Sequence, residues 1–258
     1  MAPEPTPILA PPPPAGAPPT PDKVRLRFRK DGALRLLSHH DLMRCFERML
    51  RRAALPVRQS KGFHPKPRLV FALSLPLGVV GCEEVVELEL EEILPAEEVR
   101  ERLVRQAPPG LEILELHHID FRTTARVHSL TYRIVVPAER IAEAARRAAD
   151  LLAATECWAE RARPTPRRVD LRPWILNLRV DETRFSRSSE RSAPLRAAAK
   201  QDVYLETELC LTPAGTARPE EVLAALGLSD LLEAGAVLER SRLVLADETP
   251  PPPAEGNA

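Results

Sequence analysis

The stretch that decides the fold is residues 38–78, SHHDLMRCFERMLRRAALPVRQSKGFHPKPRLVFALSLPLG. It begins as a helix, because Ser38 suits an N-cap and Asp41 places an acid in the first turn, where the helix dipole favours it. Pro56 ends this helix, since proline disfavours helical geometry in the residue before it. The predicted buried side of the helix holds Leu42, Cys45, Phe46, Met49, Leu50 and Ala53, and its predicted free side holds Arg44, Arg48, Arg51 and Arg52.

A basic loop, residues 60–68, follows the helix. It contains Lys61, Gly62, Phe63, His64, Lys66 and Arg68, with prolines at positions 65 and 67. Cations suit phosphates, an aromatic ring suits a nucleobase, and the prolines reduce the entropy lost on binding. We therefore expect a recognition surface for a polyanion here. The alternative is that Phe63 fills the core while the prolines only guide the chain past a sheet edge.

The charges are strongly segregated along the chain, although the formal net charge is zero. Residues 23–81 hold 14 Lys and Arg against three acids, whereas residues 82–120 hold three Arg against 12 acids. Residues 121–200 are basic again, with 17 cations and nine acids. A basic face favours a polyanion such as RNA. The alternative is that these blocks neutralise one another in the fold.

The segments on either side of the opening stretch predict further strands and a helix. Residues 23–30 alternate between apolar and basic side chains, which predicts a half-buried strand with a basic outer face. Asp31-Gly32 is typical of a tight hairpin turn, so residues 33–37 are expected to return as an antiparallel strand. Downstream we expect an interior strand at 69–75, a strand at 84–92 with Glu87, Glu89 and Glu91 on an exposed acidic face, a helix at 95–106 and a strand at 111–116.

This order of elements is that of a split βαβ, or ferredoxin-like, unit. The second half repeats it, with strands at 130–136, 169–180, 203–211 and 237–245 and helices at 137–154 and 219–226. We therefore expect an α+β fold of two tandem ferredoxin-like units with antiparallel sheets, at residues 22–120 and 128–246. Proline-rich tails at 1–21 and 247–258 and a flexible basic insertion at 183–200 are expected to be disordered.

The sequence carries no signature of a known catalytic or metal site. It lacks a Walker loop and the GxGxxG, GxSxG and HExxH motifs, and its four cysteines show no metal-ligand spacing. His39 and His40 are adjacent on a helix, so they point about 100° apart and cannot chelate one metal together. We expect no cofactor and no metal. The N-terminus has neither a basic signal region nor an apolar span, so a cytoplasmic protein without a membrane segment is expected.

A second candidate binding segment lies at residues 167–173, where Arg168 and Arg172 lie on either side of Asp170. Asp170 could orient one of these arginines for binding through a bidentate pair. A structural salt bridge is the alternative.

Residues 35–44, 51–53, 55–56, 60–67 and 75–78 together resemble a bacterial family known as the radical SAM-associated, or radical SAM-linked, proteins. Residues 169–173 and 218–223 resemble its later motifs. That domain of unknown function occurs alone or fused behind a radical S-adenosylmethionine protein, so the resemblance implies a radical SAM partner and supplies no activity. This chain lacks the CxxxCxxC motif that holds an iron–sulfur cluster, so any radical chemistry would belong to the partner.

These features predict a non-enzymatic RNA-binding adaptor for tRNA or rRNA that works with a radical SAM modification enzyme or a ribosome-linked factor. Two alternatives stay open. One is a metal-independent endoribonuclease resembling the CRISPR repeat-processing enzymes, with His39, His40 or His64 as general base, and the other is a protein-interaction module for a radical SAM partner. The predicted RNA-binding residues are Arg35, Ser38, His39, Arg44, Arg48, Arg51, Arg52, Lys61, Gly62, Phe63, His64, Lys66, Arg68, Arg168 and Arg172.

Overall fold

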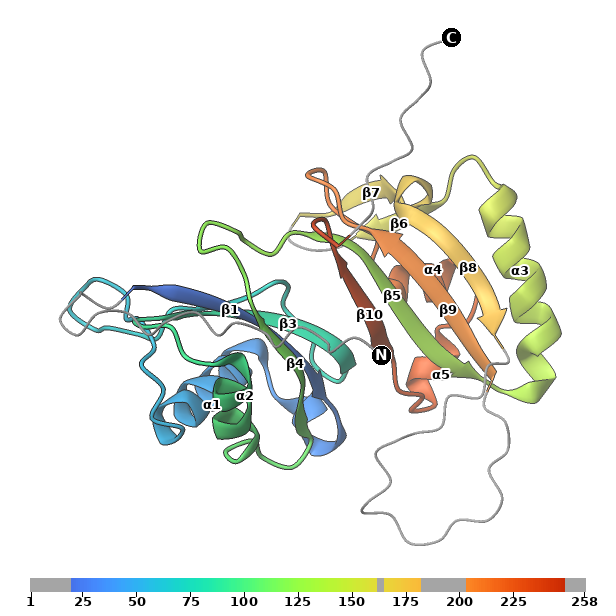
Figure 1. The fold of residues 1–258 in the computed structure, drawn as a ribbon. Coiled ribbons are helices and arrows are strands. Elements are labelled where there is room, and N and C mark those ends of the chain that lie inside the picture. Colours follow the sequence, from blue (N-terminus) through green and yellow to red (C-terminus); the bar gives the residue numbers. More distant parts are fainter. Residues whose placement is uncertain (1–19, 162–164, 182–202, 249–258) are drawn as a thin grey trace, which may run out of the picture.

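The computed structural model describes residues 20–161, 165–181 and 203–248, and in them the chain is a mixed α+β fold (Figure 1). One mostly antiparallel sheet of eight strands runs through both halves in the order β4-β1-β3-β10-β5-β9-β8, with β2 also paired to β3. The predicted insertion at 183–200 and most of the two predicted tails lie outside the described residues.

The first half, as far as residue 118, contains four strands and two α-helices. In chain order these are β1 (Asp22–Lys30), a 3-10 turn η1 (Gly32–Leu36), α1 (His39–Arg52), β2 (Leu69–Phe71), β3 (Val80–Leu90), α2 (Ala96–Val104) and β4 (Leu111–His118). The strands lie in the order β4-β1-β3-β2, and every neighbouring pair is antiparallel. The two helices lie together on one face of these strands (Figure 1).

The second half repeats this order and adds a small hairpin. Its elements are β5 (Val127–Val136), η2 (Ala138–Arg140), α3 (Ile141–Ala153), β6 (Trp158–Arg161), β7 (Arg167–Asp170), η3 (Arg172–Trp174), β8 (Ile175–Asp181), β9 (Val203–Cys210), α4 (Pro219–Ala225), α5 (Asp230–Glu233) and β10 (Glu239–Leu245). Its strands lie in the order β10-β5-β9-β8, again with antiparallel neighbours. β6 and β7 form a separate two-stranded sheet.

The two halves join where β10 pairs in parallel with the start of β3, at Val80 and Gly81. Each half has its own hydrophobic core. Leu75, Val79 and Val85 come from the first half of the chain, yet they pack in the core of the second half. The chain between Leu75 and Val85, which begins at the end of the stretch at 38–78, therefore ties the two halves together.

The predicted start and buried side of the helix in the opening stretch are confirmed, but α1 ends at Arg52, before Pro56, with Ala53 as its C-cap and a φ of +49° at Ala54. The Ser38 hydroxyl accepts a hydrogen bond from Asp41 N at 3.2 Å, so Ser38 is the N-cap of α1. The predicted apolar side is buried, and Phe46 and Leu42 are completely enclosed. Arg44, Arg48, Arg51 and Arg52 all lie on the exposed side.

Several predicted strands differ from the structure. Residues 33–37 do not return as a strand, because β3 and β4 already occupy both edges of β1; η1 forms at Gly32–Leu36 instead. The predicted interior strand at 69–75 is only the short edge strand β2. The predicted strand at 169–180 is broken by η3, where Pro173 interrupts it, into β7 and β8. β6 and α5 were not predicted.

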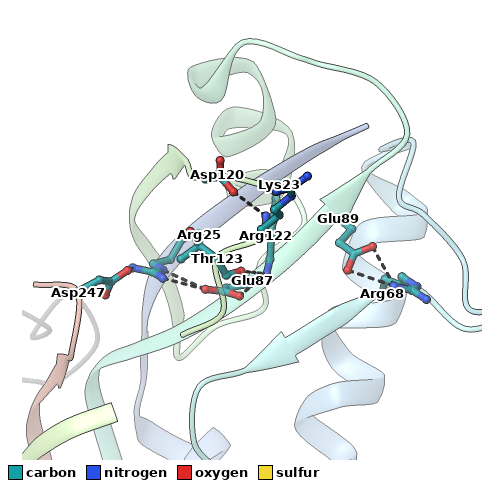
Figure 2. A network of polar contacts seen from close by, with 9 residues as sticks. All are labelled: Lys23, Arg25, Arg68, Glu87, Glu89, Asp120, Arg122, Thr123 and Asp247. Atoms are coloured by element: carbon teal, nitrogen blue, oxygen red, sulfur yellow. Dashed lines mark hydrogen bonds and ion pairs between the residues drawn. The ribbon is translucent and has the colours of Figure 1, made fainter. Parts of the chain in front are cut away.

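The prediction that the charged faces of β1 and β3 are exposed is also wrong in part. Arg25 is 2% exposed and Glu87 is 1% exposed, and the two form an ion pair at 2.9 Å (Figure 2). Lys23 joins them, with its Nζ 2.7 Å from Glu87. The segment directly after β10 also contacts this face, because Asp247 pairs with Arg25 at 2.9 Å, although the sequence predicts a disordered tail from residue 247. Here the basic and acidic blocks neutralise each other inside the fold.

Candidate nucleic-acid interface

The basic loop after α1 is a hairpin, residues 58–68, whose arms are held by backbone hydrogen bonds. Arg68 N donates to Arg58 O at 2.7 Å, and Ser60 N donates to Lys66 O at 2.8 Å. The arms are fixed to the end of β3, because Arg58 N donates to Glu89 O at 2.9 Å and Glu89 N donates to Arg68 O at 3.1 Å. The sheet therefore supports this 58–68 hairpin, and its tip projects from the sheet.

The tip of the hairpin carries the exposed aromatic ring. Phe63 is 102% exposed, so the alternative in which it fills the core is wrong. Lys61, His64 and Lys66 beside it are also exposed. Gly62 has φ +143°, a backbone conformation that L side chains rarely adopt, which explains a glycine directly before the ring.

The cations of the 58–68 hairpin are not equivalent. Arg68 pairs with Glu89 at 3.2 Å (Figure 2). Arg58 lies 3.8 Å from the same carboxylate. Lys61 and Lys66 have no carboxylate partner among the residues that the structure describes. The two lysines are therefore better placed than Arg68 to hold phosphates.

The predicted binding residues of α1 and of the turn before it divide into exposed and structural groups. Arg48, Arg51 and Arg52 are exposed, and Arg44 makes only a surface contact with Asp41 at 3.3 Å. Arg35 is half-buried in η1 and donates to Gly32 O at 3.4 Å. The hydroxyl of Ser38 is already used as the helix cap.

His39 is not placed to act as a surface cation. Its ring packs edge-on against Phe71, with 5.2 Å between the ring centroids. Within the described chain its buried Nδ1 has no hydrogen-bond partner. Burial, together with the nearby charges of His40 and Lys30, lowers the pKa of His39, so its ring is neutral at pH 7.

The contacts of Asp170 and Arg172, in the segment at residues 167–173, differ from those predicted. The guanidinium of Arg172 donates to Leu152 O, Ala154 O and Ile175 O at 2.8–3.1 Å, so it holds the end of α3 against the start of β8. Asp170 accepts from the backbone amides of Cys157 and Arg172 at 2.7 and 3.0 Å rather than from an arginine side chain. Both predicted roles of Asp170 are therefore wrong.

Arg168 remains exposed and lies over the ring of Trp158, with Cζ 4.8 Å from the ring centroid. Trp158 itself is 48% exposed. No sequence pattern singled out Trp158 as a binding residue, because the strand that carries it was not predicted. One feature of the sequence could have indicated a role in binding, because a run of cations follows Trp158 within a few residues.

A groove of about 1160 Å³ is lined by residues of both halves, such as Arg29 and Cys82 from the first half and Thr131 and Glu206 from the second. Its cations are Arg29, Arg35, Arg133, Arg179 and Arg242, and its acids are Asp31, Glu83, Glu112, Glu206, Glu208 and Glu239. Many of them are paired across strands, as Arg133 is with Glu239 and Arg179 is with Glu206. The groove therefore offers a polyanion little net attraction.

The groove has no reactive thiolate at Cys82, and the described residues of the chain contain no metal-binding cluster. Burial raises the pKa of the Cys82 thiol, which lines the groove, to about 11, so it is not a thiolate at neutral pH. Within residues 20–161, 165–181 and 203–248, no group of three His, Cys, Asp or Glu side chains is arranged to hold a metal ion. In the same ranges no helix has the length and apolar character needed to cross a bilayer.

Comparison with known proteins places the chain in a family. Residues 23–209 match the family described as "Uncharacterized protein conserved in bacteria (DUF2344)", and the chain belongs to that family. Curated proteins gave no match. Among solved structures, the chain is similar to the crystal structure of an unknown protein from Galdieria sulphuraria, with 12% identity over 88% of this chain and 99% of that one. The TM-score of 0.24 is too low to support an argument about fold.

Proposed function

We propose that this member of the DUF2344 family is a non-enzymatic RNA-binding adaptor, which binds tRNA or rRNA through the 58–68 hairpin and the exposed side of α1. The observation that carries the proposal is the fully exposed ring of Phe63 between Lys61, His64 and Lys66. An apolar ring in water has no stabilising role in the free protein, whereas a ring between cations can stack on a base while the cations hold phosphates.

We further propose that the two halves are tandem ferredoxin-like units. Each half has the element order of a split βαβ unit, and the strand orders β4-β1-β3-β2 and β10-β5-β9-β8 are equivalent. Sheets of this kind commonly present RNA-binding residues. In this chain the balanced charge of the groove lined by both halves argues for binding at the hairpin and α1 instead.

The resemblance to radical SAM-linked proteins motivates the second part of the proposal, in which the bound RNA is presented to a radical SAM modification enzyme or a ribosome-linked factor. The protein would supply positioning, and the partner would supply the chemistry. This part has its own test, because a partner recruited through RNA is released by nuclease and a directly bound partner is not.

RNA affinity measured against salt concentration tests the first part. We expect wild-type protein to bind total tRNA with an affinity that falls steeply with salt. The double variant Lys61→Ala/Lys66→Ala should bind more weakly at low salt, with a salt slope smaller by about two, because each lost phosphate contact removes about one unit. Arg68 is left intact because its replacement would also leave Glu89 without its closest partner.

The matched control is Arg146→Ala, which removes an exposed cation from α3 in the other half. Its affinity and salt slope should equal those of wild type. Equal binding by wild type, the double lysine variant and the control would overturn the proposed interface. A lack of tRNA and rRNA binding by wild type at low salt would overturn the proposed function.

A further inference from the structure

The β6–β7 hairpin occupies the same place in the second half that the 58–68 hairpin occupies in the first. Each lies between the first α-helix of its half and the next strand of the main sheet, since one connects α1 to β2 and the other connects α3 to β8. Each also presents an exposed aromatic ring beside exposed cations, Phe63 in the first and Trp158 in the second. The repeat therefore places an aromatic and basic hairpin in both halves.

The inner face of the β6–β7 hairpin is anchored to the core of the second half. Ala159 and Val169 pack against this core, and Arg161 is 7% exposed and forms a bidentate pair with Glu221 at 2.7 and 2.8 Å. This anchoring holds the outer face in a fixed position.

The outer face presents a stacked indole and guanidinium. The antiparallel register, with Trp158 opposite Asp170 and Glu160 opposite Arg168, puts Trp158 and Arg168 on the same face. Trp158 Nε1 donates to Glu156 at 2.6 Å, which fixes the plane of the ring. Both side chains remain exposed, so a planar group can stack on them.

The charges around this face decide what it can bind. Arg168 is accompanied by two exposed carboxylates, Glu156 and Glu160, whereas Arg167 lies opposite Arg161 of the inner face, so the outer face has no excess of positive charge. It cannot contribute much to phosphate binding, whereas indole and guanidinium planes both stack well on nucleobases. An unpaired base is the nucleic-acid group that fits such a surface.

We propose that Trp158 and Arg168 form a second RNA contact, which stacks on an unpaired base and makes RNA binding by this chain bipartite. The inference rests on the proposed function and extends it, because it makes single-stranded segments of the RNA the preferred target of the second half. The two contacts differ in kind: the 58–68 hairpin contributes charge and stacking, and the β6–β7 hairpin contributes stacking alone.

The chain contains two tryptophans, so the variant Trp174→Phe leaves Trp158 as the sole indole reporter. We expect an oligouridylate to quench its fluorescence at the concentrations at which the anisotropy of the labelled oligonucleotide rises. A fully paired RNA duplex of equal length should quench it much less. Trp158→Ala should lower oligouridylate affinity about tenfold and leave the salt slope unchanged, in contrast to Lys61→Ala/Lys66→Ala.

Trp174 is half-buried and donates to Thr212 Oγ1 at 3.2 Å, so its replacement could disturb folding. If circular dichroism shows such a disturbance, the difference in quenching between wild type and Trp158→Phe gives the same information. Oligouridylate binding without quenching, or equal quenching by the duplex, overturns the second contact and leaves the proposed function standing. If no RNA raises the anisotropy signal, both proposals fail.

Discussion

Arg240 and Glu84 form a buried ion pair between β10 and β3, at the point where the two halves of the chain meet. Arg240 Nε donates to Glu84 Oε1 at 2.8 Å, a second guanidinium nitrogen contacts the other carboxylate oxygen, and the side chains are only 1% and 3% exposed. Arg240 also donates to Tyr132 on β5 at 3.4 Å. Because β3 and β10 share only a short parallel pairing, this ion pair is a main determinant of how the halves are joined.

Replacing Arg240 alone should strongly destabilise the fold. Arg240→Met leaves the buried Glu84 carboxylate unpaired, and the expected loss is about 3–5 kcal/mol in the free energy of unfolding. Arg240→Met/Glu84→Met replaces both charges by apolar side chains of similar length and should recover most of the loss. Urea unfolding of the two variants and wild type measures both values. A double variant no more stable than the single one would show that the charges themselves are not the cause.

Arg25 forms ion pairs with two carboxylates, those of Glu87 and Asp247, and the contribution of each to stability can be compared (Figure 2). The Glu87 side chain is fully buried and pairs with both Lys23 and Arg25, whereas the Asp247 side chain is 44% exposed. Glu87→Gln should therefore cost about 3 kcal/mol or more in unfolding free energy. Asp247→Asn should cost less than about 1 kcal/mol, because solvent screens an exposed pair. Similar losses in the two variants would contradict this ranking.

His39 should make stability depend on pH in the weakly acidic range. Burial lowers its pKa in the folded protein, so the unfolded chain binds a proton more readily. The stability associated with neutral His39 is complete above the unfolded pKa of about 6.5 and is lost as pH falls through the lower folded pKa. We expect the difference in unfolding free energy between wild type and His39→Gln to be constant at pH values well above about 6.5 and to change as the pH falls below this value. A constant difference would contradict the assignment.

Much of the fold follows from periodicity in the sequence, because residues that alternate or recur along a helix face must bury their apolar side. Val86, Leu88 and Leu90, which alternate with the glutamates of the predicted strand at 84–92, are all completely buried. The Asp31-Gly32 pair misled because a local turn signal cannot report that both edges of β1 are filled by strands from elsewhere in the chain. Tertiary pairing overrides local preference in such a case.

The candidate site was predictable where exposure follows from local sequence, as in the 58–68 hairpin and the arginine side of α1. It was not predictable where a charge finds a distant partner. Arg172 was predicted to bind RNA, yet its guanidinium donates hydrogen bonds to backbone carbonyls at the end of α3 and the start of β8. The alternation in residues 84–92 correctly put Glu87 on the side of β3 opposite Val86 and Leu88. It could not show that Lys23 and Arg25 would pair with Glu87 and bury it.

Ser38 separates a structural role from a binding role. Its hydroxyl accepts from Asp41 N and donates to the Asp41 carboxylate at 2.7 Å, which lowers the pKa of that acid and completes the start of α1. Ser38→Ala should therefore lower the free energy of unfolding by about 1 kcal/mol, and Ser38→Thr, which keeps a hydroxyl cap, should lower it less. Since the hydroxyl is already engaged, the tRNA affinity of folded Ser38→Ala should equal that of wild type. Denaturant unfolding and tRNA titration of the same samples test both statements. A large loss of affinity with unchanged stability would show instead that Ser38 contacts the ligand.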